Sequence, residues 1–316
     1  MNEITVIERG EILAPKMITE DLYSRFTSYI DAKPKTVATY TRAIRQFASF
    51  LSLRGITQPR REDILAFREE LQATGHKPTT VQNYITATRL FFQWTAQEGI
   101  YPNIAEHIKG AKLSKEHKKD YLTSKQVKKI LASIDRSTVQ GLRDYAMLSL
   151  MITGGLRTIE VSRADVGDIT FKRERRVLKV WGKGHAEKDD FVVLTDEAWI
   201  PIEQYLQERG DCKPQEPLFA THGLGHAGGR MSTRSIQDIC KKNLRAIGLD
   251  GHEYSAHSLR HTTGTQILKN GGSMMDVQQV LRHTSPSTSQ LYVNTIMEEK
   301  RLDDASEQIL DGSFKK

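Results

Sequence analysis

A lysine-rich stretch divides the chain into two regions with regular hydrophobic patterns. Residues 109–129 hold eight lysines and two acidic residues, which is six of the seven net positive charges of the 316-residue chain. The first half of this stretch has no apolar period, whereas the flanking regions do. We therefore expect an N-terminal extension of unassigned structure at 1–17, a first domain at 18–108, a basic linker at 109–122 and a second domain at 123–316.

The linker allows two interpretations. A run of charge is most often a solvated connector. Alternatively, its lysines contact the phosphates of a nucleic acid. The candidate contacts are Lys115, Lys118 and Lys119.

The first region predicts a bundle of four helices. Apolar side chains recur at helical spacing in segments that start near Thr19, at Pro34, near Glu62 and after Pro78. Basic, hydroxyl and amide side chains gather at the starts of the second and fourth segments, where they suit phosphate oxygens. These candidate DNA-binding residues are Lys35, Thr36, Arg42, Lys77, Thr79, Thr80 and Asn83.

The second region predicts a mainly α domain with a small β-sheet. Thr123 and Gln126 form a capping-box pattern at the start of its first helix. Two β-rich runs, at 177–181 and 191–194, flank a glycine-bearing loop and predict a hairpin. Further helices are expected at 142–153, near Asp196, near Ser232, at 257–269 and at 274–281, followed by an acidic amphipathic stretch at 298–310.

Several function classes lack sequence support. The chain has no apolar run of 18 residues and no signal-peptide pattern at its start, so we expect a cytoplasmic protein without a membrane span. Two cysteines and unpaired histidines predict no metal site. Walker, dinucleotide-binding, G-x-S-x-G and H-E-x-x-H motifs are all missing, so no cofactor is expected.

The remaining candidates for functional residues are short polar motifs flanked by apolar residues. Each has an ordinary structural explanation when taken singly: an arginine and a glutamate three residues apart form a helix ion pair, and a lysine in a turn is solvated. Their order along the chain is more informative than any one of them. The candidates are Arg157, Glu160, Lys183, His257, Arg260, His283 and Tyr292.

This order resembles the tyrosine recombinases, or phage integrase family, and is most similar to its short Xer-like members. The resemblance covers about 120–300, and the first domain resembles the family's helical core-binding domain. One residue departs from the common pattern: Arg282 stands where a small glycine is usual before the second histidine. We expect this change to affect local packing near His283 and to leave the catalytic set intact.

The resemblance implies that Arg157 and Arg260 hold the scissile phosphate. A protonated, planar guanidinium suits that role because it binds phosphate oxygens bidentately. Glu160 is then expected to orient Arg157 or neighbouring groups, because a carboxylate cannot bind an anionic phosphate directly. Preorganised cations also stabilise the charge that develops in the transition state.

The resemblance further implies that Tyr292 attacks phosphorus and forms a 3′-phosphotyrosyl intermediate. His257 is the candidate base, Lys183 the candidate acid for the leaving 5′-oxygen, and His283 a donor to a phosphate oxygen. Nearby cations are expected to favour deprotonation of the phenol, whose unperturbed pKa is about 10.

The implied partner is a double-stranded DNA recombination site, bound by a homotetramer that joins two such sites. The two biological uses are integration and excision of a mobile element, or resolution of DNA dimers. The stretch after Tyr292 either docks onto a neighbouring protomer or packs within its own chain. The alternatives are a DNA-binding regulator that has lost catalysis and a type IB topoisomerase-like enzyme.

Overall fold

The computed structural model describes residues 18–112, 120–181, 187–223 and 227–303. The chain separates into two compact units between residues 115 and 116. The extension at 1–17 and four predicted site residues, Lys115, Lys118, Lys119 and Lys183, lie outside the described residues. None of the described helices is long and apolar enough to cross a membrane.

The first unit is a bundle of four helices, as its apolar spacing predicts. The helices are α1 (Glu20–Tyr29), α2 (Pro34–Leu53), α3 (Arg61–Ala73) and α4 (Pro78–Gln97). Proline occupies the first turn of α2 and of α4, where its missing N–H costs nothing. The ring of Phe47 packs edge-on against Phe67 and Phe92, at centroid distances of 5.1 and 5.9 Å, and joins α2, α3 and α4 in one core.

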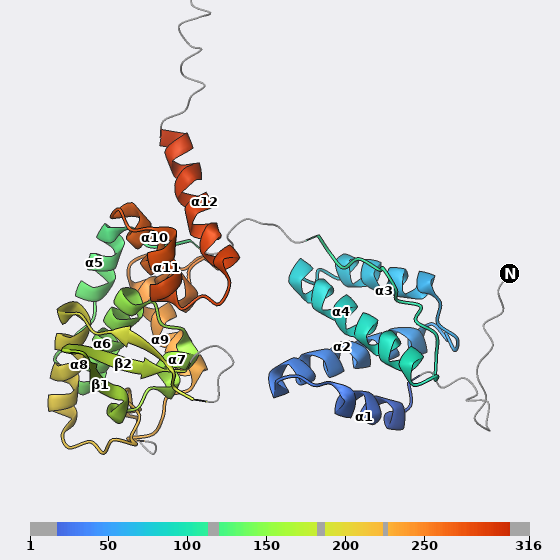
Figure 1. Cartoon of the computed structure of the whole chain (residues 1–316), viewed down its shortest axis with the longest axis horizontal. Helices are drawn as coiled ribbons and strands as arrows, with labels where there is room; N and C mark the ends of the chain where they lie inside the picture. The colour runs from blue at the N-terminus through green and yellow to red at the C-terminus, as the bar shows by residue number, and fades with distance from the viewer. Residues whose placement is uncertain (1–17, 113–119, 182–186, 224–226, 304–316) are drawn as a thin grey trace, which may run out of the picture. The chain divides into compact units, whose positions relative to one another are not determined.

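The second unit is mainly helical and contains one small sheet (Figure 1). The predicted capping box is present: the Thr123 hydroxyl accepts the Gln126 N–H at 3.3 Å, and the Gln126 side chain accepts the Thr123 N–H at 2.8 Å. The helices are α5 (Ser124–Ala132), α6 (Val139–Gly154), α7 (Thr158–Arg163), α8 (Asp196–Arg209), α9 (Thr233–Ala246), α10 (Ala256–Lys269), α11 (Met274–Leu281) and α12 (Pro286–Asp303), with a short 3-10 turn η1 (Val166–Asp168).

The sheet has three antiparallel strands in the order β1 (Ile169–Lys172), β2 (Arg175–Val180) and β3 (Asp190–Val193). The expected hairpin is the β2–β3 pair, in which Leu178 is opposite Val192. The sequence interpretation missed β1, a four-residue strand without a buried residue, in which Phe171 is 65% exposed. Val192 lies near Gly154, so the sheet packs against the end of α6.

Helix α12 begins earlier than expected and carries Tyr292 within it. It packs on α10 and α11 of its own chain and then extends away from them (Figure 1). Near the far end of α12, the Glu299 carboxylate accepts the hydroxyl of Tyr121 and lies 2.7 Å from the Lys269 ammonium. The described part of this helix is therefore held in cis, and residues 304–316 lie outside the described residues.

Candidate active site

Arg157 is the N-cap of helix α7, two residues after the left-handed Gly155 (φ +59°), and Glu160 lies in the first turn of that helix. The Glu160 carboxylate accepts the backbone N–H of Arg157 at 2.9 Å and its guanidinium at 2.6 Å. Glu160 is 4% exposed. Burial alone raises the pKa of its carboxyl, but Arg282, Arg157 and Arg260 together hold that pKa below its ordinary value. Glu160 is thus a buried anion that fixes Arg157.

Arg260 projects from α10 into the interior and is 2% exposed. Its terminal nitrogens donate to the carbonyls of Gly155 and Leu281, which ties α10 to the end of α6 and to α11. Burial and the nearby guanidinium groups lower the pKa of Arg260 to about 9, so it stays protonated at neutral pH. These protein acceptors take one hydrogen from each terminal nitrogen and leave others for an anion.

Arg282 does more than affect the packing near His283, because its side chain also contacts Glu160. It adopts the left-handed conformation (φ +53°) after α11. Its side chain, 4% exposed, reaches the Glu160 carboxylate at 2.8 Å. It also donates to the carbonyls of Gly154 at 3.2 Å and Gly155 at 3.3 Å. A third guanidinium therefore belongs to this cluster.

Tyr292 lies in α12 against two histidine rings and is 2% exposed. Its ring centroid is 4.8 Å from that of His261 and 6.0 Å from that of His283. Burial raises the pKa of its phenol, while Arg260 and Arg157 lower it, and the net shift is upward. The two arginines thus act in the expected direction, but burial outweighs them, so the phenol is harder to deprotonate than a solvent-exposed tyrosine.

His283 is buried beside the arginines, and its Nδ1 forms a hydrogen bond with the Ser289 hydroxyl at 2.8 Å. Burial, followed by Arg260, Arg157, Arg282 and His257, lowers its pKa to about 4. The imidazole is consequently neutral at pH 7. A neutral ring that accepts the Ser289 hydroxyl at Nδ1 carries its proton on Nε2, which makes that nitrogen a donor.

The remaining predicted residues are placed as follows. His257 lies in the first turn of α10, exposed, and close enough to His283 to lower its pKa. Lys183 belongs to the segment between β2 and β3 that lies outside the described residues. In the first unit, the predicted DNA-binding residues fall on α2 and α4 or at the start of α4, and five of them are exposed: Lys35, Arg42, Lys77, Thr79 and Asn83.

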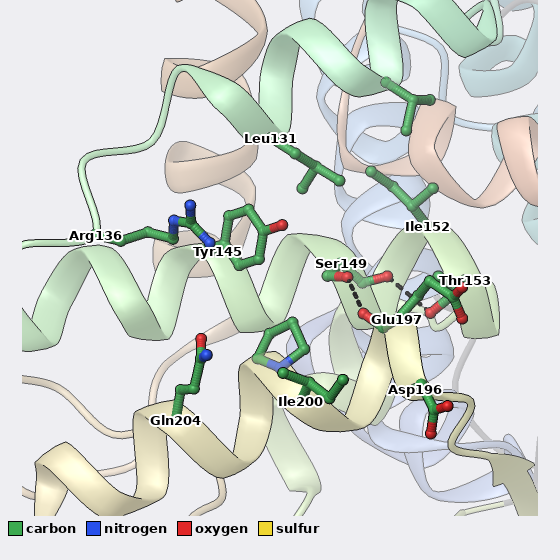
Figure 2. Close-up of a pocket in the computed structure, with 12 residues that line it drawn as sticks. Leu131, Arg136, Tyr145, Ser149, Ile152, Thr153, Asp196, Glu197, Ile200 and Gln204 are labelled. Carbon is green, nitrogen blue, oxygen red and sulfur yellow. Dashed lines mark hydrogen bonds between the residues drawn. The ribbon is translucent and has the colours of Figure 1, made fainter.

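A separate pocket of about 440 Å³ lies between α5, α6 and α8 (Figure 2). Leu131, Ile152 and Ile200 form part of its apolar lining, and the Ser149 hydroxyl donates to the Glu197 carbonyl at its wall. The pocket includes none of the predicted catalytic residues. Among the described residues, no group of three or more His, Cys, Asp or Glu side chains could hold a metal ion.

Both units match known protein-family models. Residues 120–299 match the phage integrase family, and residues 22–102 match the N-terminal SAM-like domain of phage integrases. The chain belongs to the phage integrase family of tyrosine recombinases. The expected family and the mainly α fold with a small sheet are confirmed.

Similar proteins place this recombinase near the Xer members of the family. It is 30% identical over 266 residues to "Tyrosine recombinase XerD" of Listeria innocua, which covers 82% of this chain and 87% of the relative. It is 32% identical over 270 residues to "Tyrosine recombinase XerC" of Actinobacillus pleuropneumoniae, which covers 83% of this chain and 84% of the relative.

Solved structures show the same fold. The XerH site-specific recombinase bound to a palindromic difH substrate, in a post-cleavage complex, has a TM-score of 0.72 at 20% identity and covers 90% of this chain and 83% of that one. A lambda integrase dimer bound to a COC′ core site has a TM-score of 0.65 at 15% identity, with 86% and 76% covered.

Three contacts in this recombinase were not expected from its sequence. Arg282 reaches Glu160 from 122 positions further along the chain, Ser289 bonds His283, and His261 lies against Tyr292. His261 sits directly after Arg260, so its position in the motif was a signal. The contacts of Arg282 and Ser289 depend on how α11 and α12 fold back onto α7 and α10.

Proposed function

We propose that this recombinase cuts and rejoins double-stranded DNA at a specific site, through a 3′-phosphotyrosyl intermediate on Tyr292. One observation carries the proposal. Two arginines from different elements, Arg157 and Arg260, converge near the phenol of Tyr292 and act on its pKa. A buried tyrosine beside two cations is suited to attack an anionic phosphodiester, because the same cations can hold the phosphate.

The scissile phosphate would bind to the guanidinium groups of Arg157 and Arg260. Arg157 is the more accessible of the two, with 28% of its side chain exposed, and Glu160 fixes its orientation. The Nε2 hydrogen of neutral His283 would donate to a further phosphate oxygen. These donors are already held by protein contacts, so they need little reorganisation when charge develops on the phosphate oxygens.

Cleavage then exchanges one phosphoester for another. The Tyr292 oxygen forms a bond to phosphorus while the bond from phosphorus to the 5′-oxygen breaks. His257 would take the phenolic proton, and Lys183 would supply the proton that the 5′-oxygen needs. Rejoining reverses these steps with a 5′-hydroxyl of the partner strand, and the covalent intermediate conserves the energy of the phosphoester.

The first unit and the linker would supply further contacts to the DNA. The exposed cations of α2 and α4 suit phosphate contacts, and the lysines at 115, 118 and 119 would add to them. Exchange between two sites requires four active centres, so we propose a homotetramer on DNA. Its use would be integration and excision of a mobile element or resolution of DNA dimers.

The proposal is tested with DNA that traps the intermediate. Duplexes are first selected from a randomised library by binding to the full-length chain, and the enriched sequence is made with a nick beside the cleavage position. After cleavage, the fragment of about 3 nucleotides between the nick and the cleavage position dissociates, because each base-pair step contributes only about 1.4 kcal/mol. Without that fragment the cleaved strand cannot be rejoined. We expect a covalent band on denaturing electrophoresis.

The variant Tyr292→Phe should bind the selected duplex and form no covalent band. A band that persists in this variant would refute the assignment of Tyr292 as nucleophile. A wild-type protein that binds without any band would favour the non-catalytic regulator. Relaxation of supercoiled DNA by single protomers, without paired sites, would favour the topoisomerase-like enzyme.

A further inference from the structure

Arg282 lies at the centre of the arginine cluster although all four of its terminal N–H groups have protein acceptors. One terminal nitrogen donates to the Gly154 and Val280 carbonyls, at 3.2 and 2.7 Å. The other donates to the Gly155 carbonyl at 3.3 Å and to Glu160 at 2.8 Å. A guanidinium whose terminal fork is fully engaged in this way has no fork left to hold a phosphate.

The acceptors of Arg282 are the same groups that position the two proposed phosphate-binding arginines. Glu160 accepts from both Arg282 and Arg157, one oxygen facing each guanidinium. The Gly155 carbonyl accepts from both Arg282 and Arg260. The backbone carbonyl of Arg282 itself lies 3.5 Å from Arg157. Arg282 therefore bridges the supports of both other arginines.

We infer that Arg282 is a positioning residue for strand cleavage: by holding Glu160 and the Gly154–Gly155 turn, it fixes the guanidinium groups of Arg157 and Arg260. This inference rests on the proposed function. It assigns a role in the reaction to a residue that reaches the phosphate only through others.

The electrostatic arrangement agrees with this role. Glu160 is faced by Arg157 at the start of α7, by Arg260 from α10 and by Arg282 from the end of α11. The titratable groups that interact with these arginines are His283 and Tyr292, and His257 lies near His283. Among the three cations, Arg282 contributes most to keeping the pKa of Glu160 low. Without Arg282, burial should raise the pKa of Glu160, so its anionic form would be lost at a higher pH.

The backbone makes Arg282→Gly an informative variant. Residue 282 has a φ of +53°, a conformation that glycine adopts without strain. The substitution therefore removes the side chain without imposing a new backbone cost. A second variant, Arg282→Lys, keeps one positive charge but cannot reach four acceptors as the fork does.

The experiment measures covalent-complex formation by the full-length chain on the nicked duplex selected above, under saturating protein. We expect Arg282→Gly to lower the first-order rate by roughly 10- to 100-fold, as a misplacement on the order of 1 Å would. DNA affinity should change little. As the pH is lowered, the cleavage rate of Arg282→Gly should begin to fall at a higher pH than the rate of the wild type. Arg282→Lys should recover part of the lost rate.

Two further variants separate positioning from general destabilisation. In a Glu160→Gln background, Arg282→Gly should have a smaller effect, because its target is already altered. The matched control is Arg209→Ala, which removes an arginine whose side chain is 7% exposed and bonded to Glu216 and to the Pro217 carbonyl, away from the site. At temperatures where it is folded, this control should cleave at the wild-type rate.

The results distinguish the inference from the function on which it rests. A wild-type chain that forms no covalent band refutes the proposed function. If wild type cleaves, equal rates and pH profiles for Arg282→Gly would overturn the inference alone, as would additive effects with Glu160→Gln. If Arg282→Gly fails to fold, a wild-type rate for Arg282→Lys would overturn it.

Discussion

Gly264 lies in helix α10 where the ring of Tyr292 leaves no room for a side chain. A Cβ atom at residue 264 would lie 2.7 and 2.8 Å from two ring carbons of Tyr292 and 3.0 Å from Leu281. The ring cannot easily move aside, because His261 and His283 lie against it. Gly264→Ala should therefore displace the proposed nucleophile without altering any polar group.

The size of the effect follows from these contacts. The ring must recede by about 0.7 Å to restore an ordinary contact of 3.4 Å. Misplacement on the order of 1 Å can cost about 100-fold in rate, so we expect cleavage to slow by roughly 10- to 100-fold. Overpacking costs about 1–3 kcal/mol, and alanine returns about 1 kcal/mol of helix propensity. The free energy of unfolding should thus fall by about 0–2 kcal/mol.

The assay compares thermal unfolding with the rate of covalent-complex formation on the nicked duplex. The control is Gly271→Ala, two residues past the end of the same helix, where φ is +87° and nothing lies within 4 Å of the added carbon. Alanine in that conformation costs roughly 1–2 kcal/mol through backbone strain. Gly271→Ala should thus lose stability yet keep the wild-type cleavage rate wherever it remains folded.

Comparing the two glycine variants shows whether cleavage depends on the position of the Tyr292 ring or only on the stability of the fold. Wild-type cleavage by Gly264→Ala would refute the reasoning. So would an equal loss of rate in both glycine variants at the same folded fraction.

Two further predictions concern residues outside the described ranges. Lys183→Ala should slow cleavage while sparing DNA affinity, measured by covalent-band formation and by titration; loss of binding would make Lys183 a phosphate anchor instead of the general acid. Neutralising Lys115, Lys118 and Lys119 should flatten the slope of log affinity against log salt by roughly 2 to 3 units, and an unchanged slope would mean that this segment is only a solvated connector.

Local signals in the sequence predicted most of the helices. Prolines 34 and 78 and the Thr123–Gln126 pair act within one turn of the helix that they start, so their effect can be read from neighbouring residues. Strand β1 was not predictable in this way. Its four residues are half-exposed or exposed, and its pairing with β2 supplies the stabilisation that its own pattern lacks.

Only those residues of the active site that belong to recognisable sequence motifs could be predicted from the sequence. The sequence pointed to Arg157, Glu160 and Arg260 but gave no reason to connect Arg282 with Glu160, because the contact spans 122 residues and depends on the fold of α11. The upward pKa shift of Tyr292 was also beyond reach. The charges that lower it are visible in the sequence, whereas the burial that outweighs them is not.

Contacts among Tyr121, Lys269 and Glu299 join the start of the second unit to α12. Tyr121 lies where the chain enters this unit, and Glu299 lies two turns beyond Tyr292 on α12. The Lys269–Glu299 pair is about one-third exposed, and ion pairs this accessible contribute at most about 1 kcal/mol. Breaking this ion pair therefore costs little free energy. The start of the second unit is thus joined to the helix that carries Tyr292 by a link that a small change in free energy can break.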